Sequence, residues 1–170
     1  MIKKIFCIVF FMSFLISCER DKNDKNFENN LNNLREYNIM QINAINEEDT
    51  NTKIKITFGN KVVQGYLNNT ITAKEFIRRL PLRMQMTRYA DREYYGKVGE
   101  DLSVNPNSIT NIFKSGDITY WIPGKSFALF INDEDNPYLS NLVVIGKITT
   151  DLNIFSDMGN SEYAYIELDL

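Results

Sequence analysis

Histidine is absent from the 170 residues, and cysteine occurs only at Cys7 and Cys18. The absence of histidine excludes the commonest general base, the commonest zinc ligand and any Ser–His or Cys–His catalytic pair. Because both cysteines lie near the N-terminus, residues beyond 18 cannot form a disulfide bond or a thiolate metal site. The chain also lacks a glycine-rich phosphate loop and a G-x-S-x-G motif, so neither nucleotide-hydrolase nor serine-hydrolase signatures are present.

The excess of negative over positive charge is also small, because the formal net charge is only -3. That balance does not require a nucleic-acid partner, and we expect none for an acidic, exported chain. Hydrophobic residues make up 44% of the sequence and aromatic residues 12%, which is typical of a globular domain. The length allows one domain with an appendage.

The first eighteen residues have the features of a secretion signal. Lys3 and Lys4 precede an apolar run from Ile5 to Ile16, which is shorter than the roughly 20 residues needed to span a bilayer. The following segment, Leu15-Ile16-Ser17-Cys18, resembles the bacterial lipobox, in which the cysteine is acylated and becomes the new N-terminus. We expect residues 1–17 to be a lipoprotein signal peptide and Cys18 to be lipidated. The alternative is a plain signal peptide or a short anchor.

A lipidated Cys18 would attach the protein to a bacterial envelope membrane, since two acyl chains give stable anchoring. Glu19 follows the cysteine, and the sorting rule of some Gram-negative bacteria then favours the outer membrane. Residues 18–52 would form a polar tether, because Glu19–Thr52 holds ten asparagines and no glycine or proline. Within it, Phe27, Leu31 and Leu34 fall at helical spacing and predict a short helix.

The folded domain is expected over residues 53–170. Apolar residues alternate over 54–58 and again over 63–67, on either side of Gly59-Asn60. A two-residue turn with glycine first is typical of type II′ and would pair Phe58 with Lys61. That register puts the two apolar faces on the same side.

The most strongly patterned hairpin runs from Gly116 to Ile131 and contains the only tryptophan, Trp121. Its two alternating runs flank Pro123-Gly124. Proline presets φ for a turn and glycine supplies a positive φ, so we expect the reversal there.

The remaining segments predict short elements. A helix is expected over Ala73–Leu80, capped by Thr70 or Thr72 and ended by Pro81. Further expected elements are a strand from Leu82, a loop-rich stretch over Asp91–Asn107, a buried strand over Leu142–Ile148, a short helix over Thr150–Met158 capped by Thr150, and a last strand over Ala164–Leu168. Because regular helices do not separate the strands, an antiparallel barrel or sandwich with helical plugs is favoured.

Four segments together resemble the bacterial cyclophilin-like domain family: EFIRRLPLRMQM, REYYGKV, GDITYWIPGKSFALF and LVVIGKI, in this order between about Lys53 and Leu168. The resemblance implies a mainly β fold, a small closed cyclophilin-like β-barrel with two short helices. It does not imply an activity. Cyclophilin isomerases use an arginine beside a Phe-rich pocket with His and Gln. Since this chain has no histidine and no isomerase sequence block, no catalytic residue is transferred.

Arginines are dense between residues 78 and 92, where five occur within fifteen positions. An arginine at the barrel mouth could hold a carboxylate or phosphate in a bidentate manner. Alternation places Arg83 opposite Met84 and Arg88 in phase with it. The alternative interpretation is solvated charge paired with Glu75, Asp91 or Glu93.

Aromatic side chains lie near the arginines and could line a groove for a peptide or a sugar. They are Tyr89, Tyr94, Tyr95 and Trp121, which core packing would explain equally well. The candidate binding site is placed at the barrel mouth, near Arg83, Arg88, Tyr94, Tyr95 and Trp121.

No cofactor or metal ion is expected. The acidic loop Asn132–Asn136 offers oxygen ligands, but Pro137 interrupts EF-hand spacing and no glutamate closes the loop. The sequence therefore predicts an envelope lipoprotein without catalytic activity, whose barrel binds an unknown small molecule, peptide or protein. The alternatives are a peptidyl-prolyl cis-trans isomerase acting on envelope proteins and a purely structural surface protein.

Overall fold

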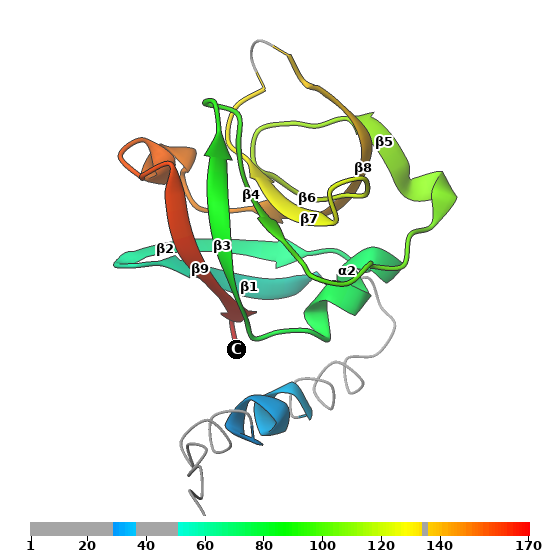
Figure 1. Cartoon of the computed structure of the whole chain (residues 1–170), viewed down its shortest axis with the longest axis vertical. Helices are drawn as coiled ribbons and strands as arrows, with labels where there is room; N and C mark the ends of the chain where they lie inside the picture. Colours follow the sequence, from blue (N-terminus) through cyan, green and yellow to red (C-terminus); the bar gives the residue numbers. More distant parts are fainter. Residues whose placement is uncertain (1–28, 37–50, 134–135) are drawn as a thin grey trace, which may run out of the picture.

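The computed structural model describes residues 29–36, 51–133 and 136–170 (Figure 1). Residues 29–36 form a helix, as the spacing of Leu31 and Leu34 predicted. The lipobox and most of the tether lie outside the described residues. Among the residues that are described, no helix is long and apolar enough to cross a membrane.

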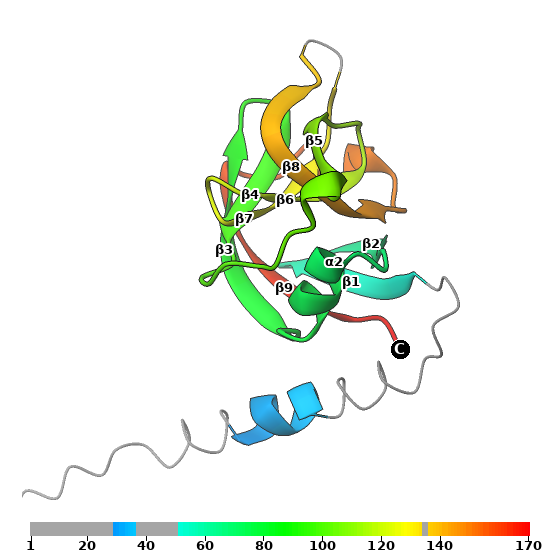
Figure 2. The ribbon, with the colours of Figure 1, turned by 90° about the vertical axis from the view of Figure 1, so that its right-hand side faces the viewer.

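Residues 51–170 form an antiparallel β-barrel with short helical segments (Figures 1 and 2). The helical segments are α2 (Ile71–Ile77) and the 3₁₀ turns η1 (Pro106–Ser108) and η2 (Leu152–Phe155). The strands are β1 (Thr52–Phe58), β2 (Lys61–Leu67), β3 (Leu82–Tyr89), β4 (Glu93–Lys97), β5 (Ile109–Ile112), β6 (Asp117–Trp121), β7 (Ser126–Phe130), β8 (Tyr138–Ile148) and β9 (Ser161–Leu168).

Eight of these strands close on themselves. Their order is β2-β1-β9-β3-β4-β7-β6-β8, and β8 pairs back with β2. Strand β5 pairs with β8 from outside this ring. The predicted mainly β, closed barrel with two short helices is therefore confirmed.

Both predicted hairpins are present, and the first has the predicted register. Phe58 pairs with Lys61, and Gly59 has a φ of 56° as its turn position requires. In the second hairpin Trp121 pairs with Ser126, but the expected role of Gly124 in the turn is wrong, because the positive φ of 48° belongs to Lys125. Gly124 instead leaves room for Trp121, whose Cε3 would lie 2.1 Å from an added Cβ.

Three boundaries differ from the prediction. The stretch 91–107 contains β4, which pairs with both β3 and β7. Helix α2 ends at Ile77 instead of Leu80, and its cap is Thr70, whose side chain accepts from Ala73 N at 3.2 Å. The expected helix over 150–158 is only the 3₁₀ turn η2, capped by Asp151 instead of Thr150.

The barrel closes where β2 meets β8 over three residue pairs, Gly65–Ile148, Tyr66–Lys147 and Leu67–Gly146. A Cβ on Gly146 would lie 2.1 Å from the backbone oxygen of Tyr66, so the two strands can approach this closely only because the residue is glycine. On the other side of β8, Ile148 N donates to Gly116 O at 2.7 Å, which joins two of the family-like segments.

Two apolar clusters flank the sheet. The larger one fills the barrel, where Phe76 of α2 stacks on Phe127 of β7 with ring centroids 4.7 Å apart. The smaller one lies on the outer face and consists of Phe113, Ala128, Phe130 and Leu142, with Tyr95, Trp121 and Leu139 packed against it. Strands β4, β6 and β7 are therefore covered on both faces, which matters for the site described next.

Candidate functional site

The five residues predicted from the sequence do not form a single site. Arg88 and Tyr94 meet at one end of the barrel, where Arg88 Nη1 lies 3.5 Å from the Tyr94 hydroxyl. Tyr95 and Trp121 line a cleft on the outer face of the barrel. Arg83 lies apart from both, with its Cζ 5.0 Å from the centroid of the Tyr163 ring.

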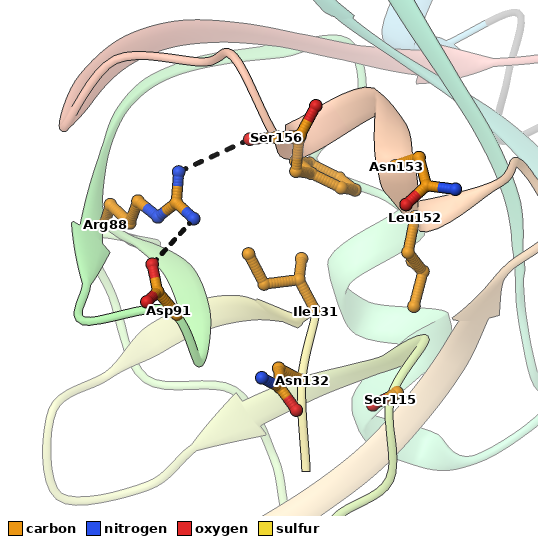
Figure 3. A pocket seen from close by; sticks show the side chains of 9 residues that line it. Arg88, Asp91, Ser115, Ile131, Asn132, Leu152, Asn153 and Ser156 are labelled. Atoms are coloured by element: carbon orange, nitrogen blue, oxygen red, sulfur yellow. Dashed lines mark hydrogen bonds and ion pairs between the residues drawn. The ribbon is translucent and has the colours of Figure 1, made fainter. Parts of the chain in front are cut away.

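The Arg88 guanidinium is already engaged by the protein (Figure 3). It donates to Asp91 Oδ1 at 3.0 Å, to the backbone oxygen of Phe155 at 3.3 Å and to that of Ala90 at 3.1 Å. The shallow groove beside it is also lined by Ser115, Ile131, Asn132, Leu152, Asn153 and Ser156. Arg88 thus fastens β3 to η2, and few of its donors remain for a ligand.

Pairing with nearby carboxylates, the alternative interpretation of the arginines, is observed for three of the five. Arg79 Nη2 lies 3.5 Å from Glu75 Oε1, and Arg88 pairs with Asp91. Arg92 Nε lies 2.5 Å from Glu93 Oε2.

Tyr94 belongs to the barrel core. It has no exposed surface, and its hydroxyl donates to Gly159 O at 2.9 Å. Its ring packs on Phe155 with centroids 5.6 Å apart. This is the core-packing alternative that the sequence left open for the aromatic residues.

The outer cleft is an apolar hollow with a volume of about 290 Å³. Residues from β3, β4, β6 and β7 contribute to it, together with Leu139 from β8. Its lining comprises Tyr89, Arg92, Glu93, Tyr95, Trp121, Ser126, Ala128 and Leu139. Tyr89, Tyr95 and Trp121, three of the four aromatic residues expected to line a groove, therefore share one cleft.

The hollow exists because its floor is built from small residues. Ala128 and Ser126 face outward from β7, with Tyr95 paired to Ala128 on one side and Trp121 paired to Ser126 on the other. Tyr95, Trp121 and Leu139 pack against the cluster that contains Ala128, which is only 2% exposed, so the cleft lies above a buried floor. The Ser126 hydroxyl donates to Gly124 O at 2.8 Å and is thereby turned to the protein.

An ion pair closes one end of the outer cleft. Glu93 is buried, with 6% of its surface exposed, and its Oε2 accepts from Arg92 Nε. Arg92 also lies over aromatic rings, with its Cζ 5.0 Å from the Tyr89 centroid and 5.5 Å from that of Phe113. Within the described residues, the Arg92 Nη atoms have no hydrogen-bond acceptor and Glu93 Oε1 has no donor.

Only the ring of Trp121 is available to a ligand in the cleft. Its Nε1–H donates to the backbone oxygen of Ser140 at 3.1 Å, so the indole is held in place and its polar atom is used. A ring fixed in this way loses little conformational entropy when a ligand packs on it.

Metal binding has no support in the described ranges, where no group of three or more Asp, Glu, Cys or His side chains could hold an ion. The one described aspartate of the acidic loop, Asp133, has a local structural role. Hydrogen bonds from the backbone N–H and the hydroxyl of Ser115, at 3.0 and 2.9 Å, lower the pKa of Asp133 below its usual value.

Sequence reasoning missed Glu93, Ala128 and Leu139 as parts of the cleft, and it treated Arg92 only as one of five arginines. Only the strand order β4-β7-β6 brings them beside Tyr95 and Trp121. A usable signal was Ser126 and Ala128 alternating with large residues in the return strand of the hairpin, since small outward residues mark a possible hollow.

Comparison with known proteins identifies the family to which the domain is similar. The model of the cyclophilin-like family matches residues 56–167. A hypothetical protein from Archaeoglobus fulgidus, solved in solution, superimposes with a TM-score of 0.59 at 24% identity, covering 72% of this chain and 98% of that one. That likeness bears on the fold alone. No curated protein matches the sequence.

Proposed function

The chain belongs to the cyclophilin-like family, and we propose that its barrel is a non-catalytic binding module whose ligand occupies the outer cleft. The observation that supports this most is the combination of three aromatic side chains and the Arg92–Glu93 ion pair around one hollow. Ligand sites are concave and mostly apolar, with a few convergent polar groups, and the outer cleft has all of these features.

We prefer the outer cleft to the groove at Arg88 because Arg88 and Arg92 differ in how many of their donors the protein already uses. The guanidinium of Arg88 donates hydrogen bonds to Asp91 and to the backbone oxygens of Ala90 and Phe155. Arg92 keeps its Nη donors without an acceptor in the described part of the chain. A ligand would therefore gain hydrogen bonds at Arg92 that it could gain at Arg88 only by displacing the protein's own.

The proposal includes the location of the module. The lipobox-like segment ending at Cys18 supports lipid anchoring in a bacterial envelope, with Glu19 favouring the outer membrane. The polar residues between Cys18 and β1 would then hold the barrel clear of the lipid surface. The partners expected for such a protein are the membrane, through its anchor, and a small molecule, peptide or protein segment.

A thermal-shift screen with and without a blocked cleft tests the binding module. The ligand panel contains proline-containing peptides, sugars and small anionic metabolites. A ligand at 100 times its Kd adds about 2.7 kcal/mol to the free energy of unfolding. In Ala128→Leu the larger side chain pushes into the cleft from its buried floor, so the shift should disappear. A shift that persists in Ala128→Leu would place the ligand elsewhere, and no shift with any compound would contradict the proposal.

One observation favours a second candidate, a peptidyl-prolyl cis-trans isomerase. Arg92 borders an apolar cleft, and an isomerase needs an arginine beside an apolar proline pocket. The Arg92–Glu93 pair and the absence of histidine weigh against it. An isomerisation assay on a proline peptide separates the two functions, because Arg92→Ala should abolish turnover if the chain is an enzyme, whereas a binding module shows no turnover in either form.

A further inference from the structure

We infer that the outer face of β9 and β3 carries a second binding site, which takes a saccharide that bears a carboxylate. Arg83 would hold the carboxylate, and Tyr165 would support the sugar ring. The site lies apart from the outer cleft and does not depend on the function proposed for that cleft. Its position is marked by an open hollow of about 440 Å³, which these two residues line together with Tyr163, Thr57 and Gly59.

Strand pairing puts three polar side chains in one row on this face. Tyr165 on β9 pairs with Thr57 on β1 and with Arg83 on β3. Residues directly opposite each other on antiparallel neighbours share one face of the sheet, so these three side chains are neighbours. That face is the outer one, because Ala164 has no exposed surface whereas Tyr163 and Tyr165 are 58% and 36% exposed.

Arg83 carries a positive charge that the protein does not neutralise. In the described part of the chain, no carboxylate pairs with this exposed arginine and its guanidinium donates no hydrogen bond. Its Cζ lies 5.0 Å from the centroid of the Tyr163 ring, a cation–π contact that restrains the side chain. The neighbouring charges of the same face, Lys55 and Glu167, already pair with each other at 3.0 Å. The guanidinium is therefore available to hold a carboxylate in a bidentate manner.

The local charge favours a carboxylate over a phosphate. Arg83 supplies one positive charge, which matches the single negative charge of a carboxylate, whereas a phosphate monoester carries about −1.5 to −2 at pH 7. Glu162 borders the hollow, where its Oε1 accepts from Gly159 N at 3.1 Å, and Glu167 lies next along the outer face of β9. Both carboxylates would repel the additional negative charge of a phosphate.

The exposed tyrosines favour a sugar ring as the part of the ligand that packs on the sheet. Tyr163 and Tyr165 are two positions apart on β9, so their Cα atoms are about 7 Å apart and their rings form an aromatic surface beside Arg83. The C–H groups on the face of a pyranose pack on such rings, and its hydroxyls can bond to the tyrosine hydroxyls and to Thr57. Burial and the charge of Glu167 raise the pKa of Tyr165, so its hydroxyl stays protonated and can donate.

The shape of the site suits a saccharide chain better than an extended peptide. Peptides commonly bind sheets by adding a strand to an exposed edge, but β9 pairs with β1 on one side and with β3 on the other. The side towards the β1–β2 turn is open, since no atom lies within 4 Å of a Cβ added to Gly59. A sugar unit could therefore lie on the tyrosines while the rest of its chain continues into solvent.

An NMR titration of the full-length protein measures both the binding and its location. The protein is labelled with ¹⁵N and kept in micelles of a polyoxyethylene detergent, which has no sugar headgroup. The probe is trigalacturonic acid. Its methyl ester keeps the rings and loses the charges, and a triglutamate peptide keeps the carboxylates and lacks the rings. We expect trigalacturonate to shift the amide signals of Arg83, Tyr163 and Tyr165 in a saturable manner, and both controls to bind at least about tenfold more weakly.

Protein variants test the role of each side chain. Arg83→Gln removes the charge and Tyr165→Ala removes the aromatic surface, and each should weaken trigalacturonate binding at least about tenfold. Tyr163 acts by positioning Arg83, so Tyr163→Phe should bind normally whereas Tyr163→Ala should bind more weakly. Arg78→Gln removes an exposed arginine at the end of α2 and should leave the affinity unchanged. The amide spectra verify that each variant is folded, and if Arg83→Gln fails to fold, Tyr165→Ala provides the comparison.

The outcomes separate this inference from the proposed function. Saturable binding of trigalacturonate that needs its charges, its rings and Arg83 supports the inference. Equal binding of the methyl ester or of triglutamate, binding that persists in Arg83→Gln, or no binding at all overturns it, and the proposal for the outer cleft stands. Shifts of the Trp121 indole signal without shifts on β9 would put trigalacturonate in the outer cleft, which overturns this inference and supports the proposed function.

Discussion

Single residues on the outer face of β6 and β7 decide where the barrel is covered and where it stays hollow. Ala128 lies in the small outer cluster against which Tyr95 and Trp121 pack, and Gly124 is too small to push the indole away. Thr119, on the same face of β6, is fully buried, and its hydroxyl has no hydrogen-bond partner in the described structure. A buried hydroxyl without a partner costs free energy.

Thr119→Val should stabilise the protein. The substitution replaces the unpartnered hydroxyl with a methyl group of similar size, and the free energy of unfolding should rise by about 1 kcal/mol. Chemical denaturation measures the change. Thr119→Ser is the matched control, since it keeps the hydroxyl and loses the methyl group, and it should be less stable than the wild type. A Thr119→Val protein less stable than the wild type would mean that the hydroxyl has a partner.

Glu75 is a second residue with a measurable role, because it joins α2 to the loop before β5. It accepts from Ser103 N at 2.5 Å and pairs with Arg79, which itself donates to Asp101 O at 2.8 Å. Burial alone would raise the pKa of Glu75, but the hydrogen bonds from Ser103 and the charge of Arg79 outweigh it and lower the pKa below the usual value.

Stability should therefore depend on pH through Glu75. A carboxylate whose pKa is lower in the folded state stabilises the fold above its unfolded pKa of about 4.3, and this contribution is lost as the pH falls through the folded value. Glu75→Gln should lower the free energy of unfolding by about 1 kcal/mol at pH 7, and the difference from the wild type should shrink below about pH 4. Denaturation curves at several pH values test this. A difference that stays constant with pH would contradict the role of the charge.

At the scale of elements, the sequence was most informative where turn chemistry and alternation agree. The register of β1 with β2 follows from both Gly59 and the apolar alternation, and it is correct. Strand β4 was missed because it begins with a buried glutamate and contains Gly96, and because both of its faces are covered. Alternation fails in such a strand. The candidate site was incomplete for the same reason, because only the pairing of β4 with β7 brings Glu93 and Tyr95 to the cleft.

The closing seam of the barrel gives a prediction at this scale. In Gly146→Ala the added Cβ would lie 2.1 Å from Tyr66 O, and backbone atoms cannot move aside cheaply. Because β2 and β8 pair over only three residues, the free energy of unfolding should fall by about 3 kcal/mol. Gly159→Ala is the matched control, since its Cβ would meet only the end of the Glu162 side chain at 2.9 Å. Equal effects of the two substitutions would show that the seam is not tightly packed.

At the scale of the whole molecule, the chain combines a lipobox-like start, a polar linker and one closed barrel. The barrel belongs to the cyclophilin-like family, while the proposed anchoring in the envelope rests on the sequence around Cys18. Family membership indicates the fold, and function has to be argued from the cleft that this chain builds on it.

Cys18→Ala tests the anchor. The wild-type protein should enter the membrane fraction and yield an N-terminal peptide that carries acyl chains on Cys18, detectable by mass spectrometry. The variant should lose the acyl chains and retain residues 1–17, because the lipobox requires the cysteine. An unmodified Cys18 in the wild type, with the protein released to the soluble fraction, would instead support a plain signal peptide.

The central claim is that a ligand binds in the outer cleft, and Trp121 reports on it most directly. The sequence has one tryptophan, so a ¹⁵N–¹H NMR spectrum shows a single indole signal from within this cleft. During a screen of small fragments, the account predicts that binders shift this signal and that Ala128→Leu abolishes the shifts. Binders that leave the indole signal unmoved and perturb the groove at Arg88 instead would contradict the account.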